Sequence, residues 1–271
     1  MKKYLVILNI LFCLLLMIYP SITTAEENKN ILTFEELSIK VMPEFAYHPN
    51  DEKKEHPPLL IGYQGTMLNQ TDQPQKGQIE IPLPMDEKNF RVGYVADYSS
   101  DLSKVYEIEY TIDEDKGTIS WTTSEEIQPN EVYKFVVEYY TDKLTVDKEK
   151  KSLDYQFKSF ADISLFNVSF IQPLMAENIV LDPEPEKKQT HADEEGIFSY
   201  NFQGLKAGDS KSFSMKYERS ETKPTVEFVD DEPVQNKETK NDLNMLEIAA
   251  FSVIGLIAIG GMIILVKRRK K

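Results

Sequence analysis

Three histidines are the first residues of this chain that could hold a transition metal. His48 and His56 flank the charged run 51–55 in a loop bounded by prolines, and His191 lies beside the acidic residues 193–195. A zinc or copper site needs ligands that converge at rigid spacing. Two histidines eight positions apart in a loop do not supply that geometry. We therefore predict solvated loops here, with neither a bound metal nor a cofactor.

Carboxylates and nucleophiles give no stronger signal for chemistry. The acidic residues 113–115 precede Gly117 and could offer oxygens to Ca²⁺, but they lack the spacing and the closing glutamate of an EF-hand loop, so a turn is favoured. The single cysteine, Cys13, lies in an apolar N-terminal run. The sequence contains neither a Gly-x-Ser-x-Gly motif nor a glycine-rich phosphate loop. We predict a non-catalytic protein without catalytic residues.

Aromatic side chains offer the remaining candidate site, a platform on which sugars could stack. Trp121 is the single tryptophan, and further candidates for ligand contact are Tyr139 and Tyr140, together with Tyr94, Tyr98 and Tyr106. Trp121 shares the parity of Ile119 along its predicted strand, which predicts that the indole points into the core. Core packing is the favoured interpretation, and a glycan platform is the alternative.

The charge of the chain restricts the partners that it can bind. The 271 residues carry 31 Lys and Arg against 45 Asp and Glu, a formal charge of -14. The predicted signal and tail hold seven basic residues and no acidic ones, so the rest has 24 basic against 45 acidic residues, or -21. Because phosphate binding requires clustered cations, we predict no nucleic-acid partner and no attraction to anionic polymers.

Alternating apolar residues predict strands along most of the chain. Residues 106–112 alternate in this way, and the turn residues 113–117 separate them from a second alternating run at 118–123, which predicts a hairpin. The same period recurs at 133–139, 155–157, 166–170, 198–202 and 213–217, with earlier candidates at 37–41, 59–68 and 78–83. We predict an all-β fold of one or two tandem antiparallel β-sandwich modules.

A weak internal repeat indicates how these strands could divide. Gly117–Trp121 and the strand ending at Tyr139 parallel Gly196–Tyr200 and the strand ending at Tyr217, with offsets of 79 and 78 residues. This form, a turn and then an alternating strand that ends in tyrosine, resembles the last strands of Ig-like or fibronectin-like modules in bacterial surface proteins. The resemblance implies a sandwich architecture and no named function.

Composition sets the domain boundaries. We expect a first module at 31–160 and a smaller second module at 161–219, with residues 148–151 as a charged turn inside the first. Residues 220–245 are rich in Glu, Asp, Lys, Thr and Pro and bury too little apolar area to offset their ordering entropy. We therefore predict a flexible acidic stalk after the second module.

The N-terminus carries the features of an export signal. Residues 1–25 combine two lysines, an apolar run and small residues before a predicted cleavage point at Ala25, which predicts a secretory signal peptide. An uncleaved N-terminal anchor is the alternative, because the apolar run is long for a signal core. The remaining chain contains no cysteine, so an exported body would rely on core burial without disulfides. That combination suits the surface of a Gram-positive bacterium.

The C-terminus predicts a membrane anchor. Residues 246–266 include the uncharged run Ile248–Val266, about 28 Å long as a helix, which matches a hydrocarbon core of about 30 Å. No LPxTG-like pentapeptide precedes this run, so we predict a permanent transmembrane helix and not a sorting signal. Five cations follow and predict a cytoplasmic tail and a single-pass type I topology: Lys267, Arg268, Arg269, Lys270 and Lys271.

These features together predict a protein of the cell envelope. We expect a membrane-anchored extracytoplasmic β-sandwich protein that acts through protein–protein contacts or as an assembly factor. The alternatives are a cell-envelope carbohydrate-binding protein and a solute- or metal-binding accessory protein. The predicted partners are the membrane, an envelope protein and, under the first alternative, a glycan.

Overall fold

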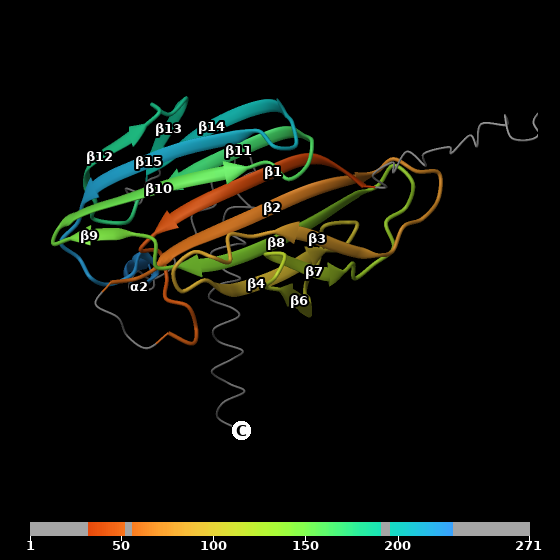
Figure 1. Cartoon of the computed structure of the whole chain (residues 1–271), viewed down its shortest axis with the longest axis horizontal. Coiled ribbons are helices and arrows are strands. Elements are labelled where there is room, and N and C mark those ends of the chain that lie inside the picture. Colours follow the sequence, from red (N-terminus) through yellow and green to blue (C-terminus); the bar gives the residue numbers. More distant parts are fainter. Residues whose placement is uncertain (1–31, 52–55, 191–195, 230–271) are drawn as a thin grey trace, which may run out of the picture. The chain divides into compact units, whose positions relative to one another are not determined.

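The computed structural model describes residues 32–51, 56–190 and 196–229, and these ranges are built almost entirely of strands (Figure 1). The strands form one eight-stranded sheet and two smaller sheets, so the predicted all-β class is confirmed. The predicted signal peptide 1–25, membrane segment 246–266 and basic tail 267–271 lie outside the described residues. Among the residues that are described, no helix has the length and apolar character needed to cross a membrane.

The eight-stranded sheet runs through the whole fold. Its order is β13-β14-β11-β1-β2-β8-β4-β5, and all neighbours pair antiparallel except β1 and β11, which are parallel. The expected purely antiparallel pairing is therefore wrong at this one place. The strands are β1 Leu32–Pro43, β2 Leu59–Asn69, β4 Arg91–Tyr98, β5 Val105–Glu107, β8 Val132–Thr141, β11 Ile163–Ile171, β13 Lys187–Thr190 and β14 Gly196–Leu205.

Two smaller sheets pack on one face of the large sheet. The first has the order β12-β15-β10-β9 and the second the order β3-β7-β6. Their strands are β3 Gln78–Pro82, β6 Tyr110–Asp113, β7 Thr118–Thr122, β9 Thr145–Asp147, β10 Lys150–Lys158, β12 Glu177–Asp182 and β15 Ser210–Glu218. We call the covered face of the large sheet the inner face and the opposite one the outer face.

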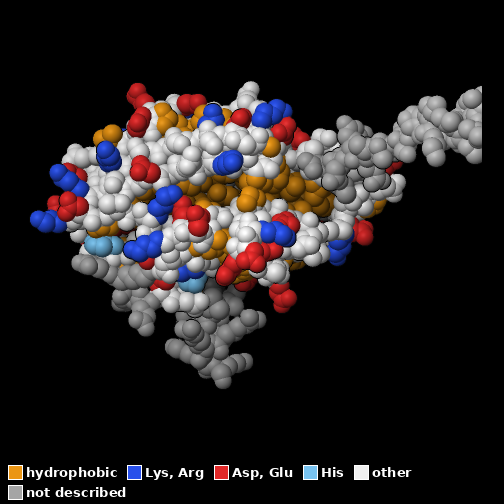
Figure 2. All heavy atoms as spheres, viewed as in Figure 1, with side chains coloured by type: hydrophobic (Ala, Val, Ile, Leu, Met, Phe, Trp, Pro, Cys, Tyr) orange, Lys and Arg blue, Asp and Glu red, His pale blue; other side chains and the backbone are white. Residues whose placement is uncertain are grey.

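Aromatic contacts show that each small sheet covers a different half of the inner face. In the four-stranded sheet, the ring of Phe213 lies 5.8 Å from that of Phe170 and 4.7 Å from that of Tyr200. In the three-stranded sheet, the ring of Trp121 lies 5.1 Å from that of Phe135. Figure 2 shows a band of apolar side chains across the middle of this view. The core is thus rich in aromatic rings, as expected of a fold that cannot use disulfides.

One glycine is required by this packing. Gly65 of β2 lies opposite Phe135 of β8, and a Cβ at Gly65 would come within 2.2 Å of the Phe135 ring. The aromatic ring therefore occupies the space that a side chain at position 65 would need, which fixes how closely the ring lies on the sheet.

The predicted boundary between modules at residues 160 and 161 does not separate two domains. β11 and β14, from the expected second module, extend the same sheet as β1 and β2. β10, from the expected first module, pairs along its whole length with β15. The described residues therefore form one sandwich within one compact unit. The reason is that strands more than 100 residues apart pair with each other, and each predicted module alone would leave an open sheet edge.

The predicted hairpin at 106–123 is confirmed only in its second half. β6 and β7 pair around the turn, where Gly117 adopts a φ of 65° that favours glycine. The first half is not one strand: β5 belongs to the large sheet and β6 to the three-stranded sheet, with residues 108–109 crossing between them. This crossing leaves β6 at a sheet margin.

The folded body extends beyond the predicted end of the second module. The short helix α2, Thr225–Val229, is held by backbone hydrogen bonds from Thr225 to Glu44 and from Val226 to Phe45, 3.0 and 3.1 Å long. Val226 packs against an apolar cluster on the outer face that contains Met42, Ala46, Leu60, Tyr140, Ile171 and Ile197. The predicted stalk 220–245 is therefore corrected at its start: residues 220–229 belong to the sandwich.

Candidate functional site

Three of the aromatic residues predicted to contact a ligand, Trp121, Tyr139 and Tyr140, do not form a platform. Trp121 and Tyr139 are buried in the core between the sheets, at 2% and 0% exposure. Tyr140, the next residue along β8, is buried in the apolar cluster on the outer face. Because successive strand residues point to opposite faces, Tyr139 and Tyr140 cannot meet one ligand. The prediction that Trp121 points inward is confirmed.

Trp121 instead begins a buried polar chain. Its indole N–H donates to the Tyr133 hydroxyl over 2.8 Å, and that hydroxyl donates to Asp97 Oδ2 over 3.1 Å. The same carboxylate oxygen accepts the Ser124 backbone N–H at 2.8 Å. Burial raises the pKa of the Tyr133 hydroxyl far above its usual value, and the Asp97 carboxylate adds to this effect. The chain fixes the ends of β4, β7 and β8 relative to each other.

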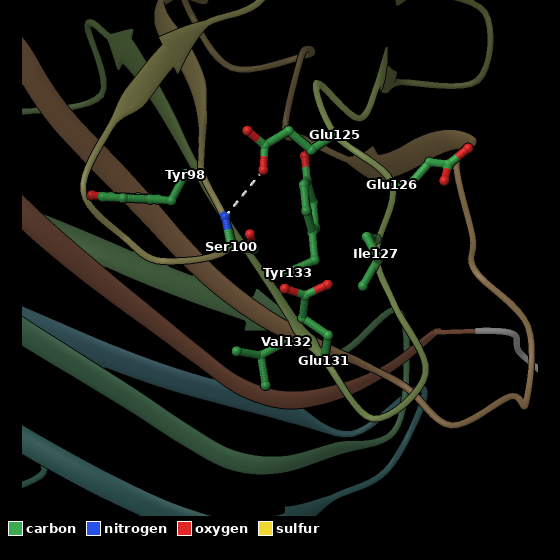
Figure 3. A pocket seen from close by; sticks show the side chains of 8 residues that line it. All are labelled: Tyr98, Ser100, Glu125, Glu126, Ile127, Glu131, Val132 and Tyr133. Atoms are coloured by element: carbon green, nitrogen blue, oxygen red, sulfur yellow. Dashed lines mark hydrogen bonds between the residues drawn. The ribbon is translucent and has the colours of Figure 1, made fainter.

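A shallow pocket lies beside these hydrogen-bonded residues, at the ends of β4 and β8, and shares Tyr133 with them (Figure 3). It encloses about 240 Å³, including space open to solvent. Its lining consists of Tyr98, Ser100, Glu125, Glu126, Ile127, Glu131, Val132 and Tyr133. Three of these residues are glutamates and none is basic, so the pocket is acidic. We call it the acidic pocket.

The glutamates of the acidic pocket are positioned by hydrogen bonds to neighbouring loops. Glu125 accepts hydrogen bonds from the Ser100 backbone N–H at 3.2 Å, drawn in Figure 3, and from the Tyr106 hydroxyl at 3.1 Å. Glu131 accepts one from the Gln128 backbone N–H at 2.7 Å. The bond to Glu125 raises the pKa of the Tyr106 hydroxyl. Two of the three carboxylates therefore have fixed positions, while Glu126 is exposed at the rim.

One exposed apolar side chain lines the pocket, and a second lies in a turn that contributes to the lining. Val132, at 37% exposure, lines the pocket, and Leu102, at 39%, lies in the β4–β5 turn that also contains Ser100. Two aromatic residues of this site were named from the sequence as candidates, Tyr98 in the lining and Tyr106 beside Glu125, but the carboxylates were missed. The acidic pair Glu125 and Glu126 between two predicted strands was the available signal, but alternation alone does not tell which connecting segments come together.

A second group of charged residues is buried near the end of the sandwich body, where α2 begins. The Arg219 guanidinium and the Lys151 ammonium lie 3.4 and 3.5 Å from Glu44 Oε1, and all three side chains are at most 1% exposed. Tyr217 donates to Glu44 Oε2 over 2.8 Å. Burial, reinforced by the Glu44 charge, raises the pKa of the Tyr217 hydroxyl well above its usual value. We call this group the charge cluster.

Arg219 connects the charge cluster to the chain that follows it. Its guanidinium donates to the carbonyl oxygens of Leu174, Glu221 and Lys223 over 2.8, 3.2 and 2.6 Å. Lys151 donates in turn to the Arg219 carbonyl over 2.6 Å. Buried charges are tolerated when they are paired and hydrogen-bonded in this way. The cluster therefore fixes residues 219–225 to the body of the sandwich.

A third pair of charges lies on the outer face. Lys40 of β1 and Glu138 of β8 both face Gly62 of β2, which leaves room between them. Burial lowers the pKa of Lys40 to about 8, an effect that Glu138 partly opposes. Burial also raises the pKa of Glu138 to about 7, against the opposite influence of Lys40.

The residues considered for metal binding have structural roles where the structure describes them. His48 is buried with its ring centroid 5.2 Å from that of Tyr140, so the predicted solvated loop is wrong at this position. Asp113 accepts the Lys116 backbone N–H at 3.1 Å, as expected of a turn, and this bond lowers the pKa of its carboxyl. His191 lies outside the described residues. Within the described ranges, no three His, Cys, Asp or Glu side chains gather as metal ligands would.

Comparison with known proteins does not assign a family. No protein-family model matches the chain, and no curated protein matches it. Crystal structures of an M1 zinc metallopeptidase from Deinococcus radiodurans and of a mutant of it align with TM-scores of 0.41 and 0.42 at 8% identity. These alignments cover 70% of this chain and 42–43% of the peptidase chains, less than half of their length. Similarity this low supports no conclusion about fold or catalysis.

Proposed function

We propose that this chain is a membrane-anchored, extracytoplasmic and non-catalytic interaction module of the cell envelope, and that the acidic pocket is its contact surface. The observation that carries the proposal is an exposed apolar side chain, Val132, in the same pocket lining as the hydrogen-bonded carboxylates Glu125 and Glu131. The exposed Leu102 lies in the turn that contributes Ser100 to this lining. Interfaces combine apolar contacts with polar groups that set orientation. A partner that presents an apolar side chain flanked by Lys or Arg fits this surface.

The rigidity beneath the pocket supports the same proposal. The Trp121–Tyr133–Asp97 chain ties three strands together directly under the surface. A surface that is already ordered before binding loses little conformational freedom in the complex, so more of its contact energy contributes to affinity.

The charge cluster supports the anchored part of the proposal. The cluster fixes residues 219–225, from which the chain continues toward the predicted anchor 246–266 and the cations Lys267–Lys271. A flexible tether that starts at a fixed point of the body limits the distance of the body from the membrane. An assembly factor at a membrane surface benefits from this arrangement.

The glycan alternative loses three of its predicted contact residues, since Trp121, Tyr139 and Tyr140 are buried, while Tyr94, Tyr98 and Tyr106 are partly exposed. The acidic pocket carries no exposed tryptophan that could replace them. Nothing in the described residues favours the solute- or metal-binding alternative over the interaction module, so we propose a single function.

A photo-crosslinking amino acid at Leu102 in intact cells tests the contact surface. We expect a specific crosslinked product from position 102 and none from Val180, which is a suitable control because it is 60% exposed on β12. Glu126→Lys should abolish the product, whereas Glu184→Lys, a matched charge reversal on the loop after β12, should leave it unchanged. Equal products from positions 102 and 180 would refute the proposed surface.

A labelling experiment tests the proposed topology. Cys13 is the only native cysteine, so in a Cys13→Ser background a single introduced cysteine reports its own side of the membrane. We expect a membrane-impermeant maleimide to label Asp72→Cys, an exposed position in the β2–β3 connection, and not Lys271→Cys on intact cells. Labelling of position 271 before permeabilisation would contradict the anchored topology.

A further inference from the structure

The free edge of β6 is a feature that the acidic pocket does not use. β6 pairs with β7 on one side, and no other strand of the described structure pairs with its second side. Figure 1 shows β6 at the margin of the three-stranded sheet. Tyr110, Thr111 and Ile112 are all exposed. The backbone N–H and C=O groups that point away from β7 are therefore open to a further strand.

Two apolar rows cross the three-stranded sheet, and their last members, at this edge, are only partly covered. The rows are Ile79–Trp121–Tyr110 and Ile81–Ile119–Ile112, each named from β3 through β7 to β6. The residues on β3 and β7 are buried, at 0–6% exposure, whereas on β6 Tyr110 is 40% and Ile112 39% exposed. Tyr110 and Ile112 share the inward parity of Trp121 and Ile119, yet the described structure covers each of them only in part. An added strand with apolar side chains at matching positions would extend both rows and bury both side chains.

The charge around β6 defines the kind of strand that would fit. Residues 107–116 contain five carboxylates and one lysine, a local charge of -4, and Figure 2 shows acidic side chains gathered where this sheet lies. The second face of the sheet is polar, with Glu80, Ser120 and Thr111 in one row. Edge-to-edge pairing of two copies would bring these charges together and is disfavoured. A partner strand with cations on its outward side would neutralise them.

The other sheet edges are less suited to pairing. β5 and β9 have three residues each, and β3 ends at Pro82, which has no N–H to donate. β13, the end strand of the large sheet, has no apolar side chain and begins with Lys187 and Lys188, whose charges would repel a cationic strand. β12 is interrupted by a register shift between Glu177 and Val180, where Asn178 has a φ of 52°. Such irregularities protect an edge from strand addition. β6 has neither a bulge nor a proline.

We propose that the free edge of β6 accepts an extended segment of a partner protein as a fourth strand, one that alternates apolar side chains toward the core with Lys or Arg toward solvent. This inference rests on the proposed function as an interaction module and names the chemistry of its partner. Main-chain hydrogen bonds would hold the segment, and the Tyr110 and Ile112 positions would select its apolar side chains.

Hydrogen exchange of the full chain with a designed peptide tests the proposal. The probe is a peptide of about ten residues, the length of a typical long strand, that alternates valine and lysine. The control has the same composition with the two residue types in separate blocks. We expect the alternating peptide to slow amide exchange in residues 110–113 and to bind at least tenfold more tightly than the control. Equal binding of both peptides would mean plain charge attraction and would overturn the proposal.

Two matched variants distinguish strand pairing at β6 from binding elsewhere on the molecule. Ile112→Asp should weaken binding of the alternating peptide by at least about tenfold, the effect of losing one buried aliphatic side chain. Val180→Asp, the same change on β12, should not. Slowed exchange only at 99–104 and 125–133 would overturn pairing at β6 while leaving the acidic pocket as the contact surface. Protection of 110–113 without peptide, together with a dimeric mass, would assign the edge to a second copy and also overturn the proposal.

Discussion

Replacing Arg219 by methionine tests whether the charge cluster stabilises the sandwich. The substitution keeps much of the side-chain volume but removes the guanidinium that lies 3.4 Å from Glu44 Oε1 and donates to three backbone carbonyls. Glu44 then remains fully buried with Lys151 as its sole cationic partner among the described residues. Removing one member of a buried ion pair destabilises a protein by about 3–5 kcal/mol. Total stabilities are about 5–15 kcal/mol, so the expected loss is a large part of the whole.

Thermal and urea unfolding of the full chain measure this loss. Each kcal/mol shifts the Tm of a domain of this size by about 2–4 °C, so Arg219→Met should lower it by roughly 6–20 °C. Adding Glu44→Gln to Arg219→Met should restore part of the stability, because the second change removes the unpaired charge. A Tm within about 2 °C of the unsubstituted chain for Arg219→Met, or a double variant as unstable as the sum of the single ones, would refute the reasoning.

Three further predictions concern the core and the outer face. Gly65→Ala should destabilise the fold by about 1–3 kcal/mol in urea unfolding, because the new methyl would clash with the Phe135 ring, whereas Gly77→Ala, with open space around it, should change stability little. Tyr133→Phe should cost about 1–3 kcal/mol, because the Trp121 N–H and Asp97 lose their common partner, and Trp121 fluorescence should shift with it. Burial raises the pKa of Glu138 in the folded protein to about 7, above its usual 4.5. Protonation of Glu138 therefore stabilises the folded state, and this contribution is complete below pH 4.5 and is lost as the pH rises through 7. The unfolding free energy of the unsubstituted chain should therefore fall by roughly 3 kcal/mol relative to Glu138→Gln over that range, and parallel pH curves for the two proteins would contradict this.

Alternation along the chain was sufficient to predict most strands. The segments 133–139, 166–170 and 213–217 lie inside β8, β11 and β15, because a strand with one buried face must alternate. Alternation carries no information about which strands pair, and so the parallel contact of β1 with β11 could not be predicted. That contact is what makes one sandwich out of the two expected modules.

The positions of the candidate functional residues were harder to predict from the sequence than the strands, for a similar reason. Trp121 was correctly predicted to point inward, from its parity with Ile119. Tyr110 and Ile112 have the same parity, but they are exposed because β6 lies at a sheet margin, and position within a sheet depends on pairing across the whole fold. Arg219 and Glu44 were not predicted at all, since charged residues are ordinarily solvated and only the tertiary structure shows that they meet.

The most direct test of the account is hydrogen exchange of the full chain with and without the partner recovered by crosslinking from Leu102. We expect the partner to slow exchange in the segments around the acidic pocket, 99–104 and 125–133, and to leave β12 unchanged. Protection confined to β12 and β13, or no protection in any described segment, would contradict the claim that this protein acts through its acidic pocket.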